Sequence, residues 1–201
     1  MPSALRDVSW ERMSNAVEKV RERLLRAAKA LANAGVPYAV VGGNAVAAWV
    51  SRVDESAVRN TRDVDLLLRR ESLDAAARAL AAAGFIHRRV AALGRAGEMD
   101  IFLDGPDGKV RDALHIVFSR EKVYPDSPEP AGDVDESEPA GDFQLVALEA
   151  LVRMKLCAFR DKDRVHLRDL IEVGLVDESW CARLSPLLRQ RLEMILASRE
   201  G

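Results

Sequence analysis

Hydrophobic positions recur every three or four residues over two long parts of the chain, which is the spacing of an amphipathic helix. The first part runs from Ser9 to Ala34, and Gly35 follows it as the residue type expected just after a helix end. The second part runs from Leu145 to Ala197 and is interrupted at Gly174 and again at Pro186. The chain is therefore predicted to begin and to end in helices.

Short β-prone apolar runs lie between these two helical parts and are separated by turn residues. They predict strands at Tyr38–Val41, Asp63–Leu68, Phe85–Leu93, Glu98–Leu103 and Ala113–Phe118. The last two flank the turn sequence Gly105-Pro106-Asp107-Gly108, so we expect them to form an antiparallel hairpin. A second, alanine-rich helix is expected from Ser72 to Gly84. These elements predict an α/β (α+β) fold.

One segment has a different composition from the rest. From Glu121 to Asp142 the chain is acidic and proline-rich, with no basic residue after Lys122, which is typical of a surface loop or tether. We interpret residues 1–120 as the core with its N-terminal helix, residues 121–142 as the acidic loop, and residues 143–201 as a helical section that completes the same domain.

Composition and charge limit the classes of protein to which this chain can belong. Of the 201 residues 48% are hydrophobic, enough for a sizeable core, and 30 basic against 32 acidic side chains give no global positive field for nucleic acid or membrane. The longest apolar stretch, Val36–Val50, is interrupted and shorter than the roughly 20 residues that cross a bilayer. With no charged-then-apolar leader and two cysteines in predicted helices, we expect a cytoplasmic protein without a membrane partner.

Two acids on one predicted strand are the first candidates for chemistry. Strand alternation places Asp63 and Asp65 on one face, with Val64 on the other. Paired carboxylates on an apolar strand repel each other and are costly to bury, so they need arginines or a divalent cation. Arg59 and Arg62 would give a structural network. We favour Mg²⁺, which one or two carboxylates commonly hold together with substrate phosphates.

A glycine pair precedes these acids in the chain. Gly42 and Gly43 end the first predicted strand, and Asn44 begins an alanine-rich helix. Glycine allows backbone N–H groups to approach an anion closely, and the dipole at a helix start favours a triphosphate there.

Together these residues resemble the nucleotidyltransferase superfamily related to DNA polymerase β, whose signature is an apolar strand, a glycine pair, a helix and Asp-x-Asp. Here the signature reads Val40–Gly43 followed by Asp63–Asp65. The details look most like the bacterial branch of AbiEii toxins and other minimal nucleotidyltransferases, in which an arginine and a threonine precede the acids, as Arg59 and Thr61 do here. The resemblance covers Tyr38 to Gly174 and implies a short mixed sheet flanked by helices.

The resemblance also implies a downstream helical motif that binds the nucleotide. Lys155 and Arg160 would face the phosphates, and Asp163 would orient one of them. Taken singly, the basic residues of this segment are more typical of a solvated helix face, whereas as a set they favour a site; they are Lys155, Arg160, Lys162 and Arg164. The implied nucleotide-binding residues are therefore Gly42, Gly43, Asn44, Thr61, Lys155, Arg160 and Asp163.

The family further implies a third carboxylate on a later strand. His115 stands in the position usually held by that acid, and Asp100 on the preceding strand is the alternative. Histidine is a poor ligand of Mg²⁺, although it can accept a proton near neutral pH. The catalytic candidates are thus Asp63 and Asp65, which are also the metal ligands, with His115 and Asp100.

The implied activity is transfer of a nucleoside monophosphate from Mg²⁺-bound NTP to an acceptor hydroxyl. In the toxin branch the acceptor is often RNA, and an antitoxin protein would be the partner. Two alternatives stay open: a non-catalytic NTP-binding or partner-binding module of the same fold, and an enzyme that modifies a small aminoglycoside-like molecule. An acidic cleft would favour the cationic small molecule, and a basic groove would favour RNA.

Overall fold

The computed structural model describes residues 9–91 and 98–198 of the chain. The helices are α1 (Trp10–Asn33), α2 (Gly42–Ser51), α3 (Leu73–Ala82), α4 (Leu148–Ala158), α5 (Asp161–Glu172) and α6 (Pro186–Ala197). The strands are β1 (Tyr38–Val41), β2 (Val64–Leu68), β3 (Phe85–Ala91), β4 (Glu98–Asp104), β5 (Leu114–Phe118), β6 (Ser137–Ala140) and β7 (Phe143–Val146). Short 3₁₀ turns lie at Glu55–Ala57, Arg70–Ser72, Val110–Asp112 and Glu178–Arg183.

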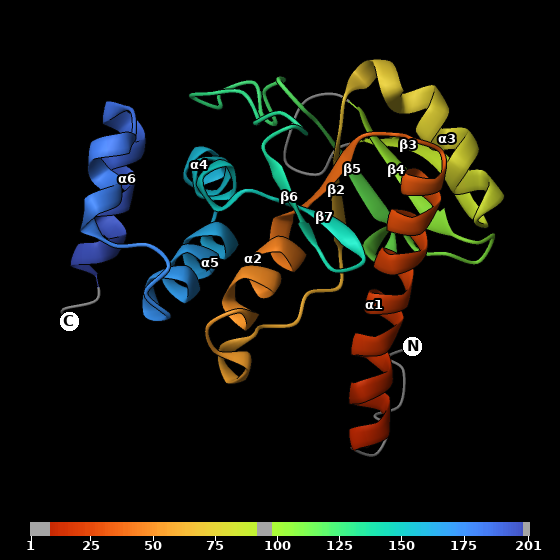
Figure 1. The fold of residues 1–201 in the computed structure, drawn as a ribbon, viewed down its shortest axis with the longest axis horizontal. Coiled ribbons are helices and arrows are strands. Elements are labelled where there is room, and N and C mark those ends of the chain that lie inside the picture. Colours follow the sequence, from red (N-terminus) through yellow and green to blue (C-terminus); the bar gives the residue numbers. More distant parts are fainter. Residues whose placement is uncertain (1–8, 92–97, 199–201) are drawn as a thin grey trace, which may run out of the picture.

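The strands form one seven-stranded mixed sheet in the order β3-β4-β5-β2-β1-β7-β6 (Figure 1). The pairs β2·β5 and β1·β7 are parallel, and the other neighbours are antiparallel. The predicted α/β fold with a mixed sheet and the predicted β4–β5 hairpin are confirmed. The predicted third strand is confirmed as far as Ala91, and its last two residues lie outside the described part of the chain.

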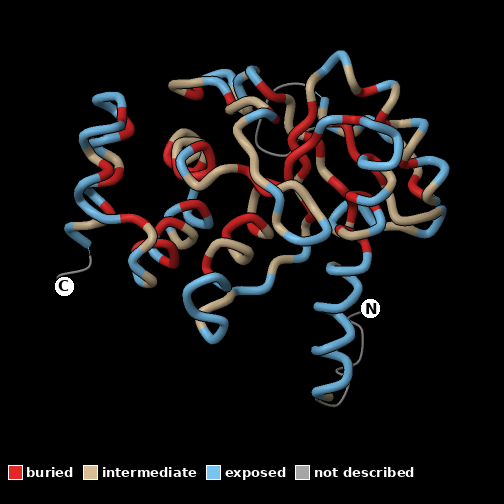
Figure 2. The backbone as a smooth tube through the Cα atoms, viewed as in Figure 1, coloured by how far each residue is buried: buried red, intermediate tan, exposed pale blue. Residues whose placement is uncertain are grey.

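Alternation along the strands gives the sheet two apolar faces. Val64, Leu66 and Leu68 of β2 are fully buried on one face, in a cluster shared with residues of α1 and α3. Leu67 lies on the other face, in a cluster shared with residues of α2, α4, α5 and α6. Figure 2 shows the buried segments of the chain between the helices. We call the face of the sheet on which Leu67 lies the α2 face.

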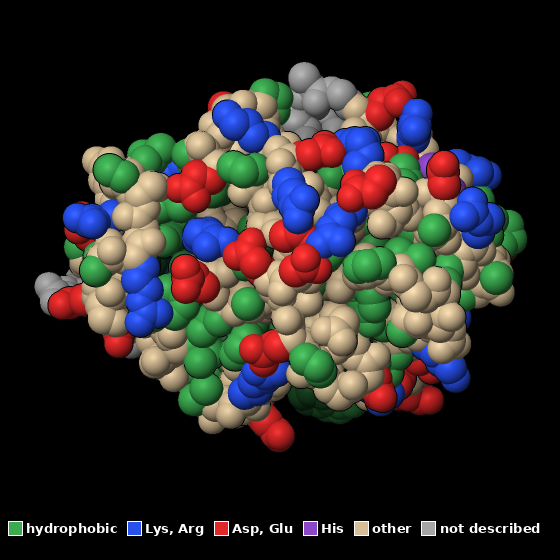
Figure 3. All heavy atoms as spheres, turned by 45° about the horizontal axis from the view of Figure 1, so that its top comes forward, with side chains coloured by type: hydrophobic (Ala, Val, Ile, Leu, Met, Phe, Trp, Pro, Cys, Tyr) green, Lys and Arg blue, Asp and Glu red, His purple; other side chains and the backbone are tan. Residues whose placement is uncertain are grey.

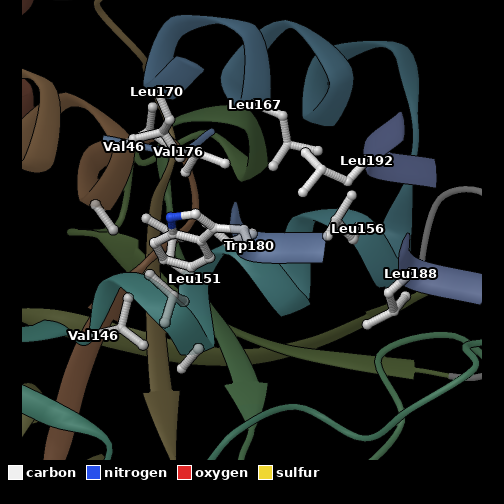
Figure 4. Close-up of a cluster of buried hydrophobic side chains, with 14 of the residues drawn as sticks. Val46, Val146, Leu151, Leu156, Leu167, Leu170, Val176, Trp180, Leu188 and Leu192 are labelled. Atoms are coloured by element: carbon white, nitrogen blue, oxygen red, sulfur yellow. The ribbon is translucent and has the colours of Figure 1, made fainter. Parts of the chain in front are cut away.

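The C-terminal helices complete the core on the α2 face. Figure 4 shows Trp180, from the turn before α6, surrounded by side chains that converge on it from several elements. Leu151 and Leu156 of α4, Leu167 of α5 and Leu192 of α6 are each 0% exposed in this cluster. One buried cluster therefore joins the C-terminal helices to the sheet.

Helix α1 confirms the first predicted helix at both ends. The Ser9 hydroxyl accepts a hydrogen bond from the backbone N–H of Arg12, and Gly35 follows with a φ of +64°. Its second half packs on the sheet, whereas its first half extends beyond the rest of the molecule (Figure 1). No helix within residues 9–91 and 98–198 has the length and apolar character that crossing a membrane requires.

The segment predicted as an acidic loop up to Asp142 differs from that prediction. Residues 137–140 form strand β6, which pairs with β7, so this part of the segment is not a loop. The prediction of helix from Leu145 was also wrong, because Leu145 lies in β7. Ion pairs fix the remaining loop to the core of the protein. Nη2 of Arg69 pairs with Asp133, and Nη2 of Arg70 pairs with Glu121. Its acidic composition is therefore balanced by basic side chains of the core.

Substitution of two leucines of α6 tests whether this helix is packed into the hydrophobic core. Leu192 is 0% exposed and Leu187 on the same helix is 43% exposed. Leu192→Ala should lower the free energy of unfolding by about 2–5 kcal/mol because it leaves a cavity, and Leu187→Ala by less than about 0.5 kcal/mol. Urea denaturation measures both, and equal losses would contradict the packing described.

Candidate functional site

The end of β2 and the start of α2 meet on the α2 face of the sheet. Asp65 is in register with Val41 of β1, and Gly42 follows Val41 directly. Gly42 has a φ of +71°, and a Cβ built on it would lie 1.9 Å from Oδ2 of Asp65. Only glycine fits this position, so the first turn of α2 sits directly against the Asp65 carboxylate.

Helix α2 begins earlier than predicted. It starts at Gly42, so the prediction that Asn44 begins the helix was wrong. The side-chain amide of Asn44 instead donates a hydrogen bond of 2.6 Å to the backbone oxygen of Asp63, the residue before β2. A Cβ on Gly43 would lie 3.0 Å from the Thr61 side chain, so this second glycine allows the loop before β2 to pack closely against α2.

His115 lies beside Asp65. The parallel register pairs Asp65 with His115, so both side chains project from the α2 face. Nδ1 of His115 is 3.6 Å from Oδ1 of Asp65, and Nε2 lies 3.1 Å from the backbone oxygen of Val110. Burial would lower the pKa of His115, but the Asp65 carboxylate outweighs it and raises that pKa above its usual value.

Asp100 is not part of this cluster. His115 is in register with Ile101, so the next residue along β4, Asp100, projects from the opposite face of the sheet. There its Oδ1 lies 2.7 Å from Nε2 of His87 and 3.4 Å from Nε of Arg89. The structure therefore does not bring the alternative third acid to Asp63 and Asp65.

Lys155, Arg160 and Asp163 converge because the predicted helical motif is broken. Helix α4 ends at Ala158, Phe159 takes a left-handed φ of 48°, and α5 starts after Arg160. Oδ1 of Asp163 is 3.4 Å from Nζ of Lys155, and its Oδ2 is 2.6 Å from Nε of Arg160. The expected link of Asp163 to a basic neighbour is thus present in the geometry.

Two members of this trio are deeply buried, and the positive charge of the trio acts on Asp65. Lys155 is 5% exposed and Asp163 is 1% exposed. Burial lowers the pKa of Lys155, against the opposing charges of Asp163 and Asp65. Burial also works against ionisation of Asp65, but His115, Lys155 and Lys162 outweigh it and hold the pKa of Asp65 below its usual value.

The alternative arginine network around the two acids does not form. Nε of Arg59 donates to Oδ1 of Asp169 on α5 at 2.7 Å. In residues 9–91 and 98–198, neither Arg59 nor Arg62 makes an ion pair with Asp63 or Asp65. Neither of these two arginines therefore neutralises Asp63 or Asp65 in the part of the chain that the structure describes.

Two further polar groups near the site, His166 and Tyr124, were not predicted from sequence to belong to it. His166 recurs with Asp163 and Asp169 every three residues along one side of α5, a spacing that could have flagged it. Burial, and then Lys155, lower the pKa of His166 to about 4, and its Nδ1 is buried without a hydrogen-bond partner. Tyr124 of the acidic loop was also missed, and its hydroxyl accepts a 2.6 Å hydrogen bond from Arg160.

A divalent cation fits the donors present, provided that a ligand supplies the rest. Within the described residues, no three His, Cys, Asp or Glu side chains form a group that could hold a metal ion. Asp65 is 24% exposed, and its carboxylate is ionised beside the N-terminus of α2. A cation held by one or two carboxylates plus phosphate oxygens needs no larger protein cage.

The face shown in Figure 3 has no large area of one charge sign. Its Lys and Arg side chains are interspersed with Asp and Glu side chains among hydrophobic and other residues. This mixture agrees with the near-neutral formal charge of −2. Any preference for a charged ligand must therefore arise from local groups such as the trio around Asp163.

Comparison with known proteins identifies one family. A family model described as an uncharacterised nucleotidyltransferase matches residues 7–149, and no curated protein matches the chain.

Solved structures give remote likenesses. The solution structure of the antibiotic-resistance factor ANT(2″)-Ia is 14% identical, with 94% of this chain and 84% of that chain covered and a TM-score of 0.38. The crystal structure of ANT(2″)-Ia with adenylyl-2″-tobramycin is 19% identical, with 94% and 99% covered and a TM-score of 0.37. The polyadenylate synthase of Megavirus is 8% identical, with a TM-score of 0.40, and the chain covers 36% of its length.

Two glycines with positive φ allow a matched test of the contact with Asp65. Gly35 has a φ of +64° and open space around its Cβ position, whereas Gly42 has a φ of +71° and the Asp65 carboxylate there. Gly35→Ala should lower the free energy of unfolding by about 1 kcal/mol, and Gly42→Ala by about 2 kcal/mol more, because it must displace that side chain. Denaturant titration measures both; equal costs would show that Asp65 moves away freely.

His166 makes stability depend on pH. Its pKa is 6.5 in the unfolded chain and about 4 in the folded protein, so the unfolded state binds more protons between these values. Stability is then lost on acidification through this window, by about 1–3 kcal/mol after allowance for partial exposure. His166→Gln should remove this loss. The difference in free energy of unfolding between wild type and His166→Gln, followed by urea denaturation, should shift in favour of the wild type as pH rises. A pH-independent difference would refute the assignment.

Proposed function

Because the chain belongs to this family of nucleotidyltransferases, we propose that it transfers a nucleoside monophosphate from an NTP to an acceptor hydroxyl, with release of pyrophosphate. The observation that carries the proposal is the contact of Gly42, at the N-terminus of α2, with the Asp65 carboxylate. This contact places an anion-binding helix end and a potential cation ligand side by side.

The triphosphate would bind at the start of α2. The first N–H groups of a helix have no partner within the helix, and its dipole favours anions there. Gly42 and Gly43 carry no side chains that would keep phosphate away from these groups, and Asn44 and Thr61 fix the adjoining loop. These four residues therefore form the proposed phosphate-binding turn.

Lys155 and Arg160 would supply positive charge to the remaining phosphate oxygens. Both are tied to Asp163, and the charge of each also acts on Asp65. A triphosphate carries more negative charge than one divalent cation offsets, so additional cationic side chains stabilise its transfer. Asp163 would act as a positioning residue that keeps both cations in place.

Nucleotidyltransferases generally use a divalent metal ion. Asp63 and Asp65 would hold it here, and their oxygen ligands suit the Mg²⁺ expected from sequence. When bound, such an ion neutralises charge on the phosphate oxygens and on the leaving pyrophosphate. His115, which is in register with Asp65, would take the place of the third carboxylate that the family resemblance implies.

RNA is the proposed acceptor, and an antitoxin protein is the proposed partner, on the basis of the AbiEii-like pattern of Arg59 and Thr61 before the acids. The test is incubation of the protein with each α-labelled NTP, a divalent cation and either total RNA or an aminoglycoside, followed by sizing of labelled products. Label in RNA supports the proposal. Label in the small molecule or tight NTP binding without transfer would support one of the two alternatives.

Replacement of both acids separates a functional from a structural role. In Asp63→Asn/Asp65→Asn the amides keep the volume, remove the negative charges and relieve their repulsion. We expect at least about a hundredfold loss of metal-dependent NTP binding, corresponding to about 3 kcal/mol, in a protein that still folds but is less stable, because the Asp65 charge interacts favourably with His115 and Lys155. Calorimetry with each NTP and a thermal melt measure the two quantities.

Asp107→Asn, at an exposed turn position, is the matched control and should bind NTP like the wild type. Retention of full NTP affinity by the double variant would refute the assignment of these acids. Loss of folding in the double variant would instead indicate a structural role.

A further inference from the structure

His115 and Asp65 face each other in a way that calls for a cation between them. Nε2 of His115 lies 3.1 Å from the backbone oxygen of Val110, which can only accept, so Nε2 carries a hydrogen. Nδ1 is therefore the ring nitrogen that faces Oδ1 of Asp65, 3.6 Å away, and without its proton it offers a lone pair to a cation. A metal ion bound to both atoms would take the place of that proton.

The spacing of 3.6 Å is longer than a hydrogen bond and closer to the separation of two ligand atoms on one metal ion. A charge-assisted N–H···O bond spans about 2.7–2.9 Å, which is clearly shorter than the separation of 3.6 Å. Two ligand atoms that each lie about 2.1 Å from one ion are about 3.0–3.5 Å apart at octahedral or tetrahedral angles. The second histidine–aspartate pair gives the contrast: Nε2 of His87 lies 2.7 Å from Oδ1 of Asp100, which leaves room for a proton alone.

We propose that Asp65 and His115 form a mixed oxygen–nitrogen site that selects a first-row transition ion, such as Mn²⁺ or Co²⁺, over Mg²⁺. Imidazole nitrogen suits transition ions, whereas Mg²⁺ prefers oxygen ligands alone. The inference rests on the proposed function, because the ion would lie at the same nucleotide site, and it replaces the expectation of Mg²⁺.

The surroundings of the pair allow an exchangeable ion. The side chain of Asp65 is 24% exposed and that of His115 is 16% exposed, so an ion can reach them from solvent. The two residues are fixed by neighbouring strands of the sheet, which holds their Cα atoms in register. Water and phosphate oxygens would complete the coordination, since no third His, Cys, Asp or Glu side chain among the described residues joins the pair.

The test measures metal binding without turnover. Mn²⁺ is titrated into the nucleotide-free protein and followed by the loss of the free-ion electron paramagnetic resonance signal, and Mg²⁺ is then added as competitor. The wild type should bind Mn²⁺ at least about tenfold more tightly than Mg²⁺. The spin-echo spectrum of bound Mn²⁺ should show modulation from a directly coordinated imidazole nitrogen. Equal affinity for the two ions, or absence of that modulation, overturns the proposal.

Two variants identify the nitrogen as His115. His115→Asp should reduce the Mn²⁺ preference to about threefold or less, because it restores an all-oxygen site, whereas His87→Gln should keep the wild-type ratio. An unchanged ratio in His115→Asp overturns the proposal. Should that variant fail to fold, His115→Gln, a neutral oxygen donor, makes the same comparison. Binding of an unreactive ATP analogue is measured separately, so a protein that prefers Mn²⁺ but does not bind the analogue would refute only the proposed function.

Discussion

The close approach of Gly42 to Asp65 is the constraint on which the rest of the site depends. No side chain larger than hydrogen fits at Gly42, because a Cβ there would overlap the carboxylate. Since β1 and β2 are antiparallel and in register, the end of one strand necessarily lies beside the acid of the other. The sheet thus fixes the relation between a helix N-terminus and a carboxylate with no long side chain between them.

The sequence predicted this part well, because it depends on local order: an apolar strand, glycines, a helix and an alternating strand. Prediction from the sequence failed where the structure depends on pairing between strands that are distant in the chain. Pro139 and the surrounding acids obscured β6, which exists because β7 offers it an antiparallel partner. The face of the sheet from which Asp100 projects follows from the register of β4 and β5, in which Ile101 and not Asp100 lies opposite His115. The spacing of residues along one strand does not reveal this register.

The break between α4 and α5 shows the same limit at the level of one residue. In a continuous helix, Lys155 and Arg160 would lie about 140° apart and could not share one partner. Phe159, with a φ of 48°, reverses the chain so that both basic groups reach Asp163. Nothing in the composition of this segment announces a left-handed phenylalanine, which is costly locally and persists because the surrounding contacts hold it.

Charge balance then explains how such a site is stable before any ligand binds. Asp163 pairs with both Lys155 and Arg160, and His115 faces Asp65, so each charge has a partner although one carboxylate is shared by two cations. Burial nevertheless lowers the pKa of Lys155, which shows that one carboxylate does not fully replace the water it has lost. An arriving phosphate would supply the missing anion, and a cation at Asp65 would meet the negative charge that phosphate brings. In the proposed function, ligand and metal ion would therefore each compensate a different deficit, and binding of one would favour binding of the other.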